Sequence, residues 1–336
     1  MSTLRDIARL SKVSVATVSR VINNDQTYSM KPETRERVWR VISEVGYKVP
    51  PPHRGAASWQ RTKGSNRVGC ILSIVKDKYR DPYFMSVLSG IEARLSHYGY
   101  FLDFLHSQIE LKNEMTLQEI LDRPPAGLIL MDALQEDLYQ RLSTVIPVRV
   151  GVDTRHEDID NVGYDHIQTA MNAVEYLLSR GHRRIAYVGG SPGDTLEISG
   201  RFVGYRTALQ RAGLPLQPQW IHNCHWDELE CIRQVTEMMD LEPRPTALFA
   251  GSDLMAIAAM SALYSKSISI PDQVAVVGIS NIELSRFSSP PLTTYEIPTL
   301  EMGRLSVDLL HNRMNDDFPL PRRILLPTRQ VLRASA

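Results

Sequence analysis

The stretch that decides the architecture of the amino-terminal part is TLRDIARLSKVSVATVSRVIN, residues 3–23. Thr3 can cap a first helix, whose apolar residues recur at helical spacing up to about Leu10. After a short break, Ser14 can cap a second helix that runs from Val15 to Asn23. Two helices joined by about three or four residues form a helix-turn-helix, which can place its second helix in the DNA major groove.

A third helix is predicted just beyond this stretch. Pro32 is favourable at the first position of a helix, and Gly46 is favourable just past its end. The apolar stripe between them consists of Val38, Val41, Ile42 and Val45. The sequence therefore predicts three short helices around one small core.

Charge is distributed unevenly along the chain. The 336 residues carry 38 Lys and Arg against 38 Asp and Glu, but residues 1–63 carry 12 against 5. A basic head therefore precedes an acidic body, and a basic helical head is typical of nucleic-acid binding. At about 150 residues per domain, the length predicts two or three folding units.

Neither a membrane segment nor a resident cofactor is expected. No apolar run approaches the roughly 18 residues of a membrane span, and no signal pattern opens the chain, so we expect a cytoplasmic protein. The three cysteines, Cys70, Cys224 and Cys231, lack the paired spacing of a zinc site or a disulfide scaffold. No phosphate-binding glycine loop is found either.

Residues 3–23 resemble the amino terminus of the lactose and galactose repressor (LacI/GalR) family. Thr34-Arg35 and Gly46-Tyr47 follow as they do in that family. The resemblance implies that Val15, Ala16 and Arg20 meet base edges. Arg20 can offer two parallel donors to guanine, which is worth about 1 to 3 kcal/mol of discrimination. The other predicted DNA contacts are Thr3, Leu4, Ser14, Thr17, Ser19, Asn23 and Tyr47.

Residues 49–66 are predicted to link this 1–48 domain to the core. In related repressors this segment forms a short helix on the operator and inserts a leucine into the minor groove. Arg54 keeps the family's arginine and is a predicted DNA contact, but Ala56 stands where the leucine would be. Three consecutive prolines also disfavour a regular helix, so strong kinking by this route is not expected. Trp59 is left open as a substitute wedge or a residue packed on the core.

The remainder, residues 67–336, alternates between strand and helix patterns. Val68–Val75 is an apolar run suited to a buried parallel strand, and Pro82–Tyr100 is a long amphipathic helix. The rhythm then repeats, with a second series expected to start at Asn161. The predicted fold class is α/β, with two doubly wound units of parallel strands.

This body resembles the sugar-binding core of the same family, which is similar to periplasmic sugar-binding proteins. The resemblance rests on GHRRIAYVGG at 181–190, GRFVGY at 200–205 and PPLTT at 290–294. It implies two lobes, one of about 67–160 and 298–325, the other of about 161–297 and 326–336. It also implies three crossings between the lobes and a ligand in the cleft, at the carboxyl ends of the strands.

Carried over position by position, the resemblance predicts an effector site from both lobes. Arg201 and Asp153 can bind vicinal hydroxyls, and Trp226 can stack on the C–H face of a sugar. Ser252 and Ser280 replace the longer polar residues usual in the family, so the effector need not be the usual one. The predicted site residues are Ser73, Tyr83, Phe84, Asp153, Arg201, Trp226, Ser252 and Ser280.

The resemblance implies a sequence-specific transcriptional repressor of a carbohydrate-utilisation operon. It looks closest to regulators of galactoside use. A sugar or glycoside would control its affinity for a palindromic operator, and paired half-sites predict a homodimer. A purine or phosphosugar effector stays open. A transport solute-binding protein would leave the basic head without a role, and no enzyme is expected, because Pro192 in the hydrolase-like GGSPG of 189–193 lacks the needed N–H.

Overall fold

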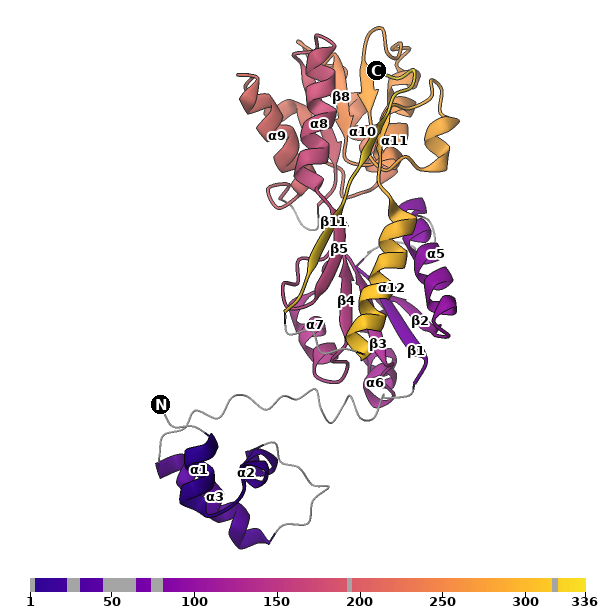
Figure 1. Ribbon diagram of the computed structural model, residues 1–336. Coiled ribbons are helices and arrows are strands. Elements are labelled where there is room, and N and C mark those ends of the chain that lie inside the picture. The colour runs from indigo at the N-terminus through magenta and orange to yellow at the C-terminus, as the bar shows by residue number, and fades with distance from the viewer. Residues whose placement is uncertain (1–3, 23–30, 45–64, 74–80, 192–194, 316–319) are drawn as a thin grey trace.

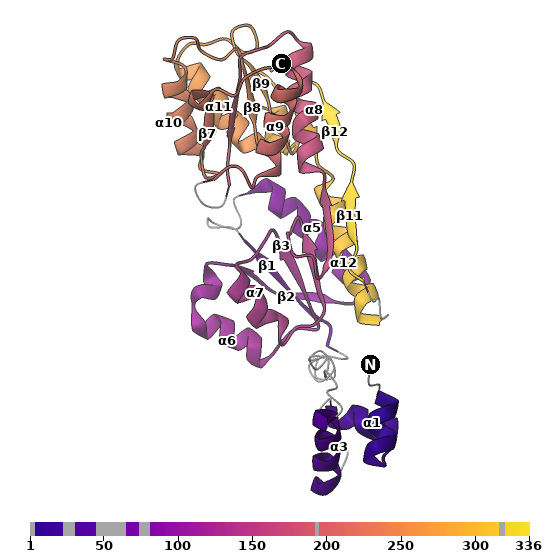
Figure 2. The ribbon, with the colours of Figure 1, turned by 90° about the vertical axis from the view of Figure 1, so that its left-hand side faces the viewer.

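The computed structural model of the chain describes residues 4–22, 31–44, 65–73, 81–191, 195–315 and 320–336. Within these ranges an amino-terminal helical unit has a core of its own, and the larger body forms two stacked lobes (Figure 1 and Figure 2). Tyr47, Arg54, Ala56 and Trp59 lie outside the described residues, as does nearly all of the predicted linker. No helix within the described ranges has the length and apolarity needed to cross a bilayer.

The amino-terminal unit is the predicted helix-turn-helix with a third helix. It consists of α1 (Leu4–Ser11), α2 (Val15–Ile22) and α3 (Pro32–Glu44). One small core joins them, in which Ile7, Val18 and Val38 are fully buried. Lys12 takes a positive φ of 52° in the turn between α1 and α2, and the Val13 N–H donates to the Ala8 carbonyl at 3.0 Å. The turn is therefore fixed by local hydrogen bonds and by burial of both helices.

The first lobe is built on a six-stranded parallel sheet of order β11-β5-β4-β3-β1-β2. Its strands are β1 (Arg67–Leu72), β2 (Phe101–Ser107), β3 (Gly127–Met131), β4 (Arg149–Val152), β5 (Asp160–Tyr164) and β11 (Arg323–Leu326). Its helices are α5 (Pro82–His97), η1 (Glu110–Lys112), α6 (Glu114–Asp122), α7 (Glu136–Ser143) and α12 (Thr299–Asn315). Along β1, Cys70 and Leu72 share a core with α5 and α12, whereas Ile71 shares one with α6 and α7. Both faces of the sheet are thus covered, as apolar parallel strands require.

The second lobe has a four-stranded parallel sheet of order β7-β6-β8-β9. Its strands are β6 (Ile185–Gly189), β7 (Ile221–Asn223), β8 (Ala247–Ala250) and β9 (Ala275–Val277). One face packs on α8 (His166–Ser179) and α9 (Gly200–Arg211), the other on α10 (Glu228–Met238) and α11 (Asp253–Ser265). The remaining elements are η2 (Pro218–Trp220), η3 (Glu283–Arg286) and the antiparallel pair β10 (Thr294–Glu296) and β12 (Arg329–Val331).

The described chain passes between the lobes three times, after β5, after β10 and after β11 (Figure 1). The predicted start of the second lobe at Asn161 is wrong by one strand. Asn161 lies in β5, and its partner across the ladder is Gly151 of β4 in the first sheet. A short apolar strand carries no local mark of which sheet it joins, because strand pairing is a long-range choice.

Helix α12 was not predicted from the sequence. Its buried residues include Met302, Ser306 and Leu310, a spacing of four that is typical of a helix face. It crosses α5 at backbone contact, because a methyl group on Gly303 would lie 2.1 Å from the Val87 carbonyl oxygen. This close crossing places the amino-terminal ends of α5 and α12 beside each other, at the cleft end of the first lobe (Figure 1).

Candidate functional site

The first candidate site is the exposed face of α2. Ser14 caps the helix as predicted: its hydroxyl accepts a hydrogen bond from the Thr17 backbone N–H at 3.1 Å and lies 2.9 Å from the Thr17 hydroxyl. Such a cap stabilises a helix by about 1 kcal/mol. It also fixes the position of the first turn of α2, where the predicted base-contacting residues begin.

Helix α2 is divided into a core face and a solvent face. Val18 and Val21 are buried, whereas Val15 is 41% exposed and Arg20 is exposed. The described side chains that are predicted to contact bases, Val15 and Arg20, are therefore exposed away from the small core, as contact with a major groove requires. Of the other predicted contacts, Thr3, Asn23, Tyr47 and Arg54 lie outside the described residues, as do the side chains of Leu4, Ala16 and Ser19.

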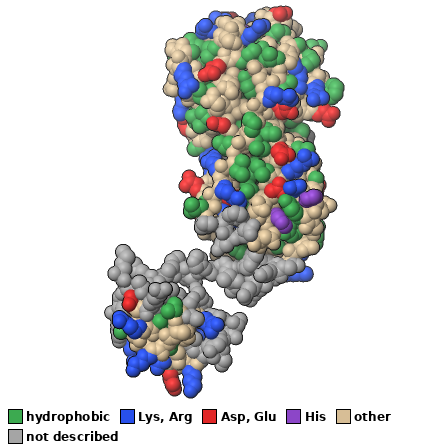
Figure 3. Space-filling model, viewed as in Figure 1, with side chains coloured by type: hydrophobic (Ala, Val, Ile, Leu, Met, Phe, Trp, Pro, Cys, Tyr) green, Lys and Arg blue, Asp and Glu red, His purple; other side chains and the backbone are tan. Residues whose placement is uncertain are grey.

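Basic side chains are exposed on the amino-terminal unit that carries this face. Figure 3 shows Lys and Arg side chains over much of the described part of the amino-terminal unit. The exposed basic residues of this unit include Arg9, Lys12, Arg20, Lys31, Arg37 and Arg40. Such a surface attracts the phosphate backbone of a duplex without regard to its sequence. The unit thus combines a general electrostatic surface with one exposed helix that can read bases.

The second candidate site lies between the lobes, where Tyr83, Asp153 and His166 meet. The Tyr83 hydroxyl donates a hydrogen bond to Asp153 Oδ2 at 2.5 Å, and His166 Nε2 lies 3.0 Å from Asp153 Oδ1. Burial opposes the charged form of Asp153, but the neighbouring His166 and the hydrogen bonds outweigh it, so the pKa of Asp153 lies below its usual value. Asp153 is therefore an ionised acceptor at the carboxyl end of β4.

Arg201 faces this cluster from the start of α9. Its Nε and Nη2 atoms both donate to the Tyr164 hydroxyl, at 3.1 and 2.7 Å. Its guanidinium carbon lies 5.3 Å from the centre of the Trp226 ring, within range of a cation–π contact. Among the described residues no partner is found for Nη1, so this nitrogen can donate to a ligand.

The Trp226 side chain is held by a tight loop between β7 and α10. Trp226 and His225 both take positive φ, 57° and 50°, which is uncommon for residues other than glycine. A methyl group on Gly190 would lie 2.4 Å from the indole, so only glycine leaves room for the ring there. The indole is thus seated directly on the backbone at the end of β6.

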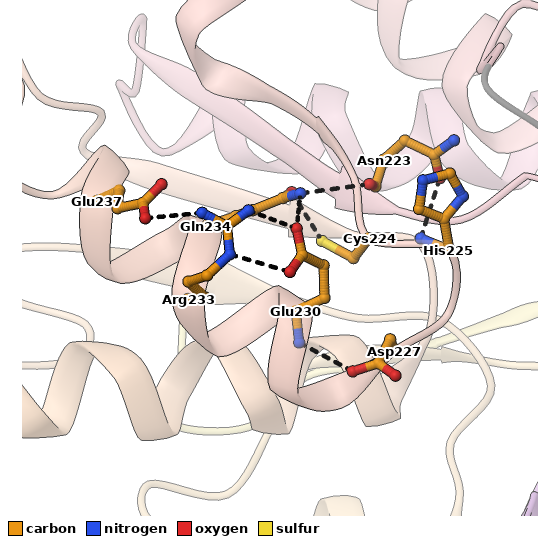
Figure 4. Close-up of polar contacts among 8 residues, drawn as sticks. All are labelled: Asn223, Cys224, His225, Asp227, Glu230, Arg233, Gln234 and Glu237. Atoms are coloured by element: carbon orange, nitrogen blue, oxygen red, sulfur yellow. Dashed lines mark hydrogen bonds and ion pairs between the residues drawn. The ribbon is translucent and has the colours of Figure 1, made fainter.

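Helix α10 ties this loop down, as Figure 4 shows. Gln234 donates from Nε2 to the Asn223 carbonyl at 3.5 Å and accepts from the Cys224 thiol at 3.3 Å. The Asn223 side chain in turn accepts from the His225 N–H at 3.1 Å. These contacts fix the residues on the amino-terminal side of Trp226. The cysteine of this loop therefore has a structural partner, and no cluster of potential metal ligands is found among the described residues.

Two carboxylates that the sequence analysis missed belong to the same group of interacting residues. Asp132 follows β3 and accepts from the Ala133 N–H at 2.7 Å; burial raises its pKa, and the charge of Asp153 adds to this. Asp81 caps α5, and burial likewise raises its pKa. Both interact favourably with the charge of Arg201. Their position at the carboxyl edge of the sheet is the signal that could have identified them.

Three other predicted effector residues have their described contacts outside the cluster of Asp153 and Arg201. Ser252 caps α11, where its hydroxyl accepts from the Met255 N–H at 3.2 Å. Phe84 packs against the core and edge-on to Tyr83 at 5.2 Å. Ser73 follows β1, and its N–H donates to the Met131 carbonyl at 3.0 Å.

Beside the cleft lies a cavity with a volume of about 640 Å³. Three segments line it: the first turn of α5, residues 280–283 with Arg286, and residues 296–301 at the start of α12. Two predicted effector residues, Tyr83 and Ser280, belong to this lining. The cavity therefore borders the cluster around Asp153 through Tyr83, whose hydroxyl binds that carboxylate.

Comparison with known families gives two matches. Residues 3–49 match the family described as bacterial regulatory proteins, lacI family. Residues 174–336 match the periplasmic binding protein-like domain. The two matches correspond to the helical unit and to the second half of the two-lobed body.

Individual relatives align over the whole chain. The HTH-type transcriptional repressor MelR of Bacillus subtilis (strain 168) is 30% identical, over all of this chain and 97% of that protein. Among solved structures, a transcriptional regulator CelR-cellobiose complex superimposes with a TM-score of 0.74 at 28% identity, over the full length of both chains. A lac repressor dimer bound to operator and the anti-inducer ONPF superimposes with a TM-score of 0.69 at 25% identity, over 99% and 98% of the chains.

Proposed function

Because this chain belongs to the LacI family and is a DNA-binding transcriptional repressor, we propose that a neutral sugar or glycoside in the interlobe cleft controls it. The observation that carries this proposal is the arrangement of Arg201 on the Trp226 ring, opposite the ionised Asp153. The open Nη1 donor of Arg201, a carboxylate acceptor and an aromatic face together match the hydroxyl groups and C–H face of a sugar ring.

The charge of the cleft disfavours a phosphorylated effector. Asp81, Asp132 and Asp153 all lie close enough to interact with Arg201, so a single guanidinium is shared among three carboxyl groups. A phosphate dianion would meet more negative than positive groups there. Galactosides are the first sugars to test, followed by cellobiose, the ligand of the similar CelR structure.

Closure of the same cleft would couple effector binding to DNA binding. Asp153 stands on the first lobe and His166 on the second, so their contact depends on how far the lobes are closed. A ligand that binds both lobes changes this closure, and with it the separation of the two reading helices in a dimer. Coupling of this kind is typically about 1 to 3 kcal/mol.

We also propose that the repressor binds a palindromic operator as a homodimer in the cytoplasm, where its DNA would be found. One exposed helix offers few base contacts, and paired half-sites mirror the twofold symmetry of a dimer. The dimeric state of the similar lac repressor on its operator supports this arrangement.

Two measurements test the proposal. A gel-shift titration on palindromic operators at moderate salt should give a clear preference over scrambled DNA, which a transport solute-binding protein would not show. A thermal-shift screen against sugars, glycosides, phosphosugars and purines should raise the melting temperature with neutral sugars, since a ligand stabilises the state that it binds. A shift confined to purines or phosphosugars would contradict the proposed effector class.

A further inference from the structure

We propose that Tyr187 donates a hydrogen bond from the second sheet to one hydroxyl group of the bound effector, and that it selects effectors that carry this group. This inference rests on the proposed sugar effector and adds a residue to its site. Tyr187 is not among the effector residues that the family resemblance predicts. It lies in β6, two residues before that strand ends at Gly189, and it is fully buried.

The Tyr187 hydroxyl is buried and, among the described residues, it has no hydrogen-bond partner. Folded proteins retain few such groups, because an unpaired buried hydroxyl lowers stability. The neighbouring Tyr205, whose ring centre lies 5.4 Å from that of Tyr187, shows the usual case: its hydroxyl donates to the Ile185 carbonyl at 2.8 Å. Burial raises the pKa of Tyr187 to about 12, so its hydroxyl keeps its proton at neutral pH and can donate a hydrogen bond to a ligand.

The position of this hydroxyl is close to the groups of the proposed effector site. Arg201 and Ser199 both lower the pKa of Tyr187 against the larger effect of burial, so both side chains lie near its hydroxyl. Ser199 immediately precedes α9, but its side chain does not cap that helix. Phe202 and Phe249 hold the tyrosine ring, with ring centres 5.4 and 5.8 Å away. The hydroxyl is therefore fixed near the start of α9, the helix that carries Arg201.

A small space lies between the Tyr187 hydroxyl and the Trp226 indole. A methyl group on Gly251, the residue after β8, would lie 3.3 Å from the Tyr187 oxygen and 3.4 Å from Cη2 of Trp226. No described atom fills that position, and one heavy atom fits there. An oxygen can approach the hydroxyl more closely than a methyl carbon, because the two atoms share a hydrogen bond. A sugar ring stacked on Trp226 can thus place one hydroxyl group against Tyr187.

This arrangement favours one group of one size. An effector hydroxyl at the position over Gly251 satisfies the Tyr187 donor, whereas an effector that lacks this hydroxyl leaves the donor unpaired in a closed site. A methoxy group at the same place would have to fit a second heavy atom into a space that accepts one. Tyr187 therefore disfavours both the deoxy and the O-methyl form of the effector at that one position.

The test is calorimetry on the full-length protein with a sugar and its set of monodeoxy analogues. The probe is the sugar that raises the melting temperature in the thermal screen, beginning with methyl β-galactoside and methyl β-glucoside. Tyr187→Phe removes only the hydroxyl and should weaken binding of the parent sugar about ten-fold. One monodeoxy analogue should bind about ten-fold more weakly than the parent sugar and should be insensitive to Tyr187→Phe, since both changes remove the same hydrogen bond.

Tyr205→Phe is the matched control. It removes a buried hydroxyl that already has a partner, so it should lower the melting temperature and leave the Kd of every sugar unchanged. A second variant, Gly251→Ala, fills the space beside Tyr187 with a methyl group. It should weaken the parent sugar more than the deoxy analogue that is insensitive to Tyr187→Phe, because that analogue places no oxygen there.

The outcomes separate this inference from the proposed effector class. An unchanged Kd in Tyr187→Phe would overturn the contact and leave a sugar effector standing. A loss that every monodeoxy analogue shares equally would overturn it as well, because the effect would then be indirect. Absence of binding by every sugar of the thermal screen would overturn the effector class itself.

Discussion

His166 Nε2 lies 3.0 Å from Asp153 Oδ1, and this contact joins the two lobes across the cleft. Asp153 follows β4 in the first lobe, and His166 is the first residue of α8 in the second. His166 is also stacked on Tyr164, with ring centres 3.9 Å apart. Since Tyr164 accepts from Arg201, one chain of contacts links the proposed effector-binding groups of both lobes.

His166→Phe should weaken effector binding about ten-fold. The ring can still stack on Tyr164, but Asp153 loses a hydrogen bond of the charged type, which is worth about 1.5 to 3 kcal/mol. Calorimetry with the effector found by the thermal screen measures the change. His182→Phe, in the same lobe but bonded to Thr246, is the control. An unchanged Kd would remove His166 from the site.

Arg20→Ala should relax base preference by about 1 to 3 kcal/mol at one position of each half-site. The exposed guanidinium is the one group of the described α2 face that can make a bidentate contact with guanine. Gel shifts on operators with single base changes measure the discrimination. Arg211→Ala, an exposed arginine of the second lobe, should change nothing. An equal loss on every DNA sequence would assign Arg20 to phosphate instead.

Asp160→Asn should destabilise the core by about 3 kcal/mol at neutral pH. The buried carboxylate accepts from Arg313 at 2.7 and 3.0 Å and from the Arg322 N–H at 2.6 Å, which ties α12 and β11 to β5. Asp308→Asn, which removes a partly exposed bond between Arg94 and α12, is the matched control and should cost less than about 1 kcal/mol. Urea unfolding measures both, and similar losses would contradict this account.

The lowered pKa of Asp160 predicts a loss of folding stability in acid. Burial opposes the charged form of Asp160, but the hydrogen bonds from Arg313 and Arg322 outweigh it, so its pKa is lowered. Its contribution is therefore present above the unfolded pKa of about 4 and is lost as pH falls through the lower folded value. Asp160→Asn should make the melting temperature depend less on pH in this acid range. An acid slope equal to that of the parent chain would contradict the assignment.

Asp253 should change the pH dependence of folding stability in the opposite direction to Asp160. Burial raises its pKa to about 6, against the hydrogen bonds from Thr294 and the Ile282 N–H. The folded state therefore holds this proton more tightly than the unfolded state, and stability should rise as pH falls from about 7 to about 4, by on the order of 2 kcal/mol. Asp253→Asn should abolish this rise, whereas the exposed Asp272→Asn should not.

Several features of the molecule follow from local sequence. The Ser14 cap, the apolar spacing and the short break at residues 11–13 are enough to specify α1 and α2, because each acts within one or two helical turns. The alternation of strand and helix patterns likewise predicts two doubly wound lobes, and α5 begins at Pro82 as that pattern predicts. The family resemblance then predicts that Arg201, Trp226, Tyr83 and Asp153 lie in one cleft.

Other features depend on contacts between distant parts of the chain. The membership of β5 and β11 in the first sheet, and the close crossing of α5 and α12, are set by strand pairing and helix packing. Asp81, Asp132 and His166 join the site only because strand ends and helix starts converge there. Tyr83 and Asp153 are 70 residues apart in the sequence and share one hydrogen bond. Local propensity fixes the elements, but burial and long-range pairing decide which of them meet.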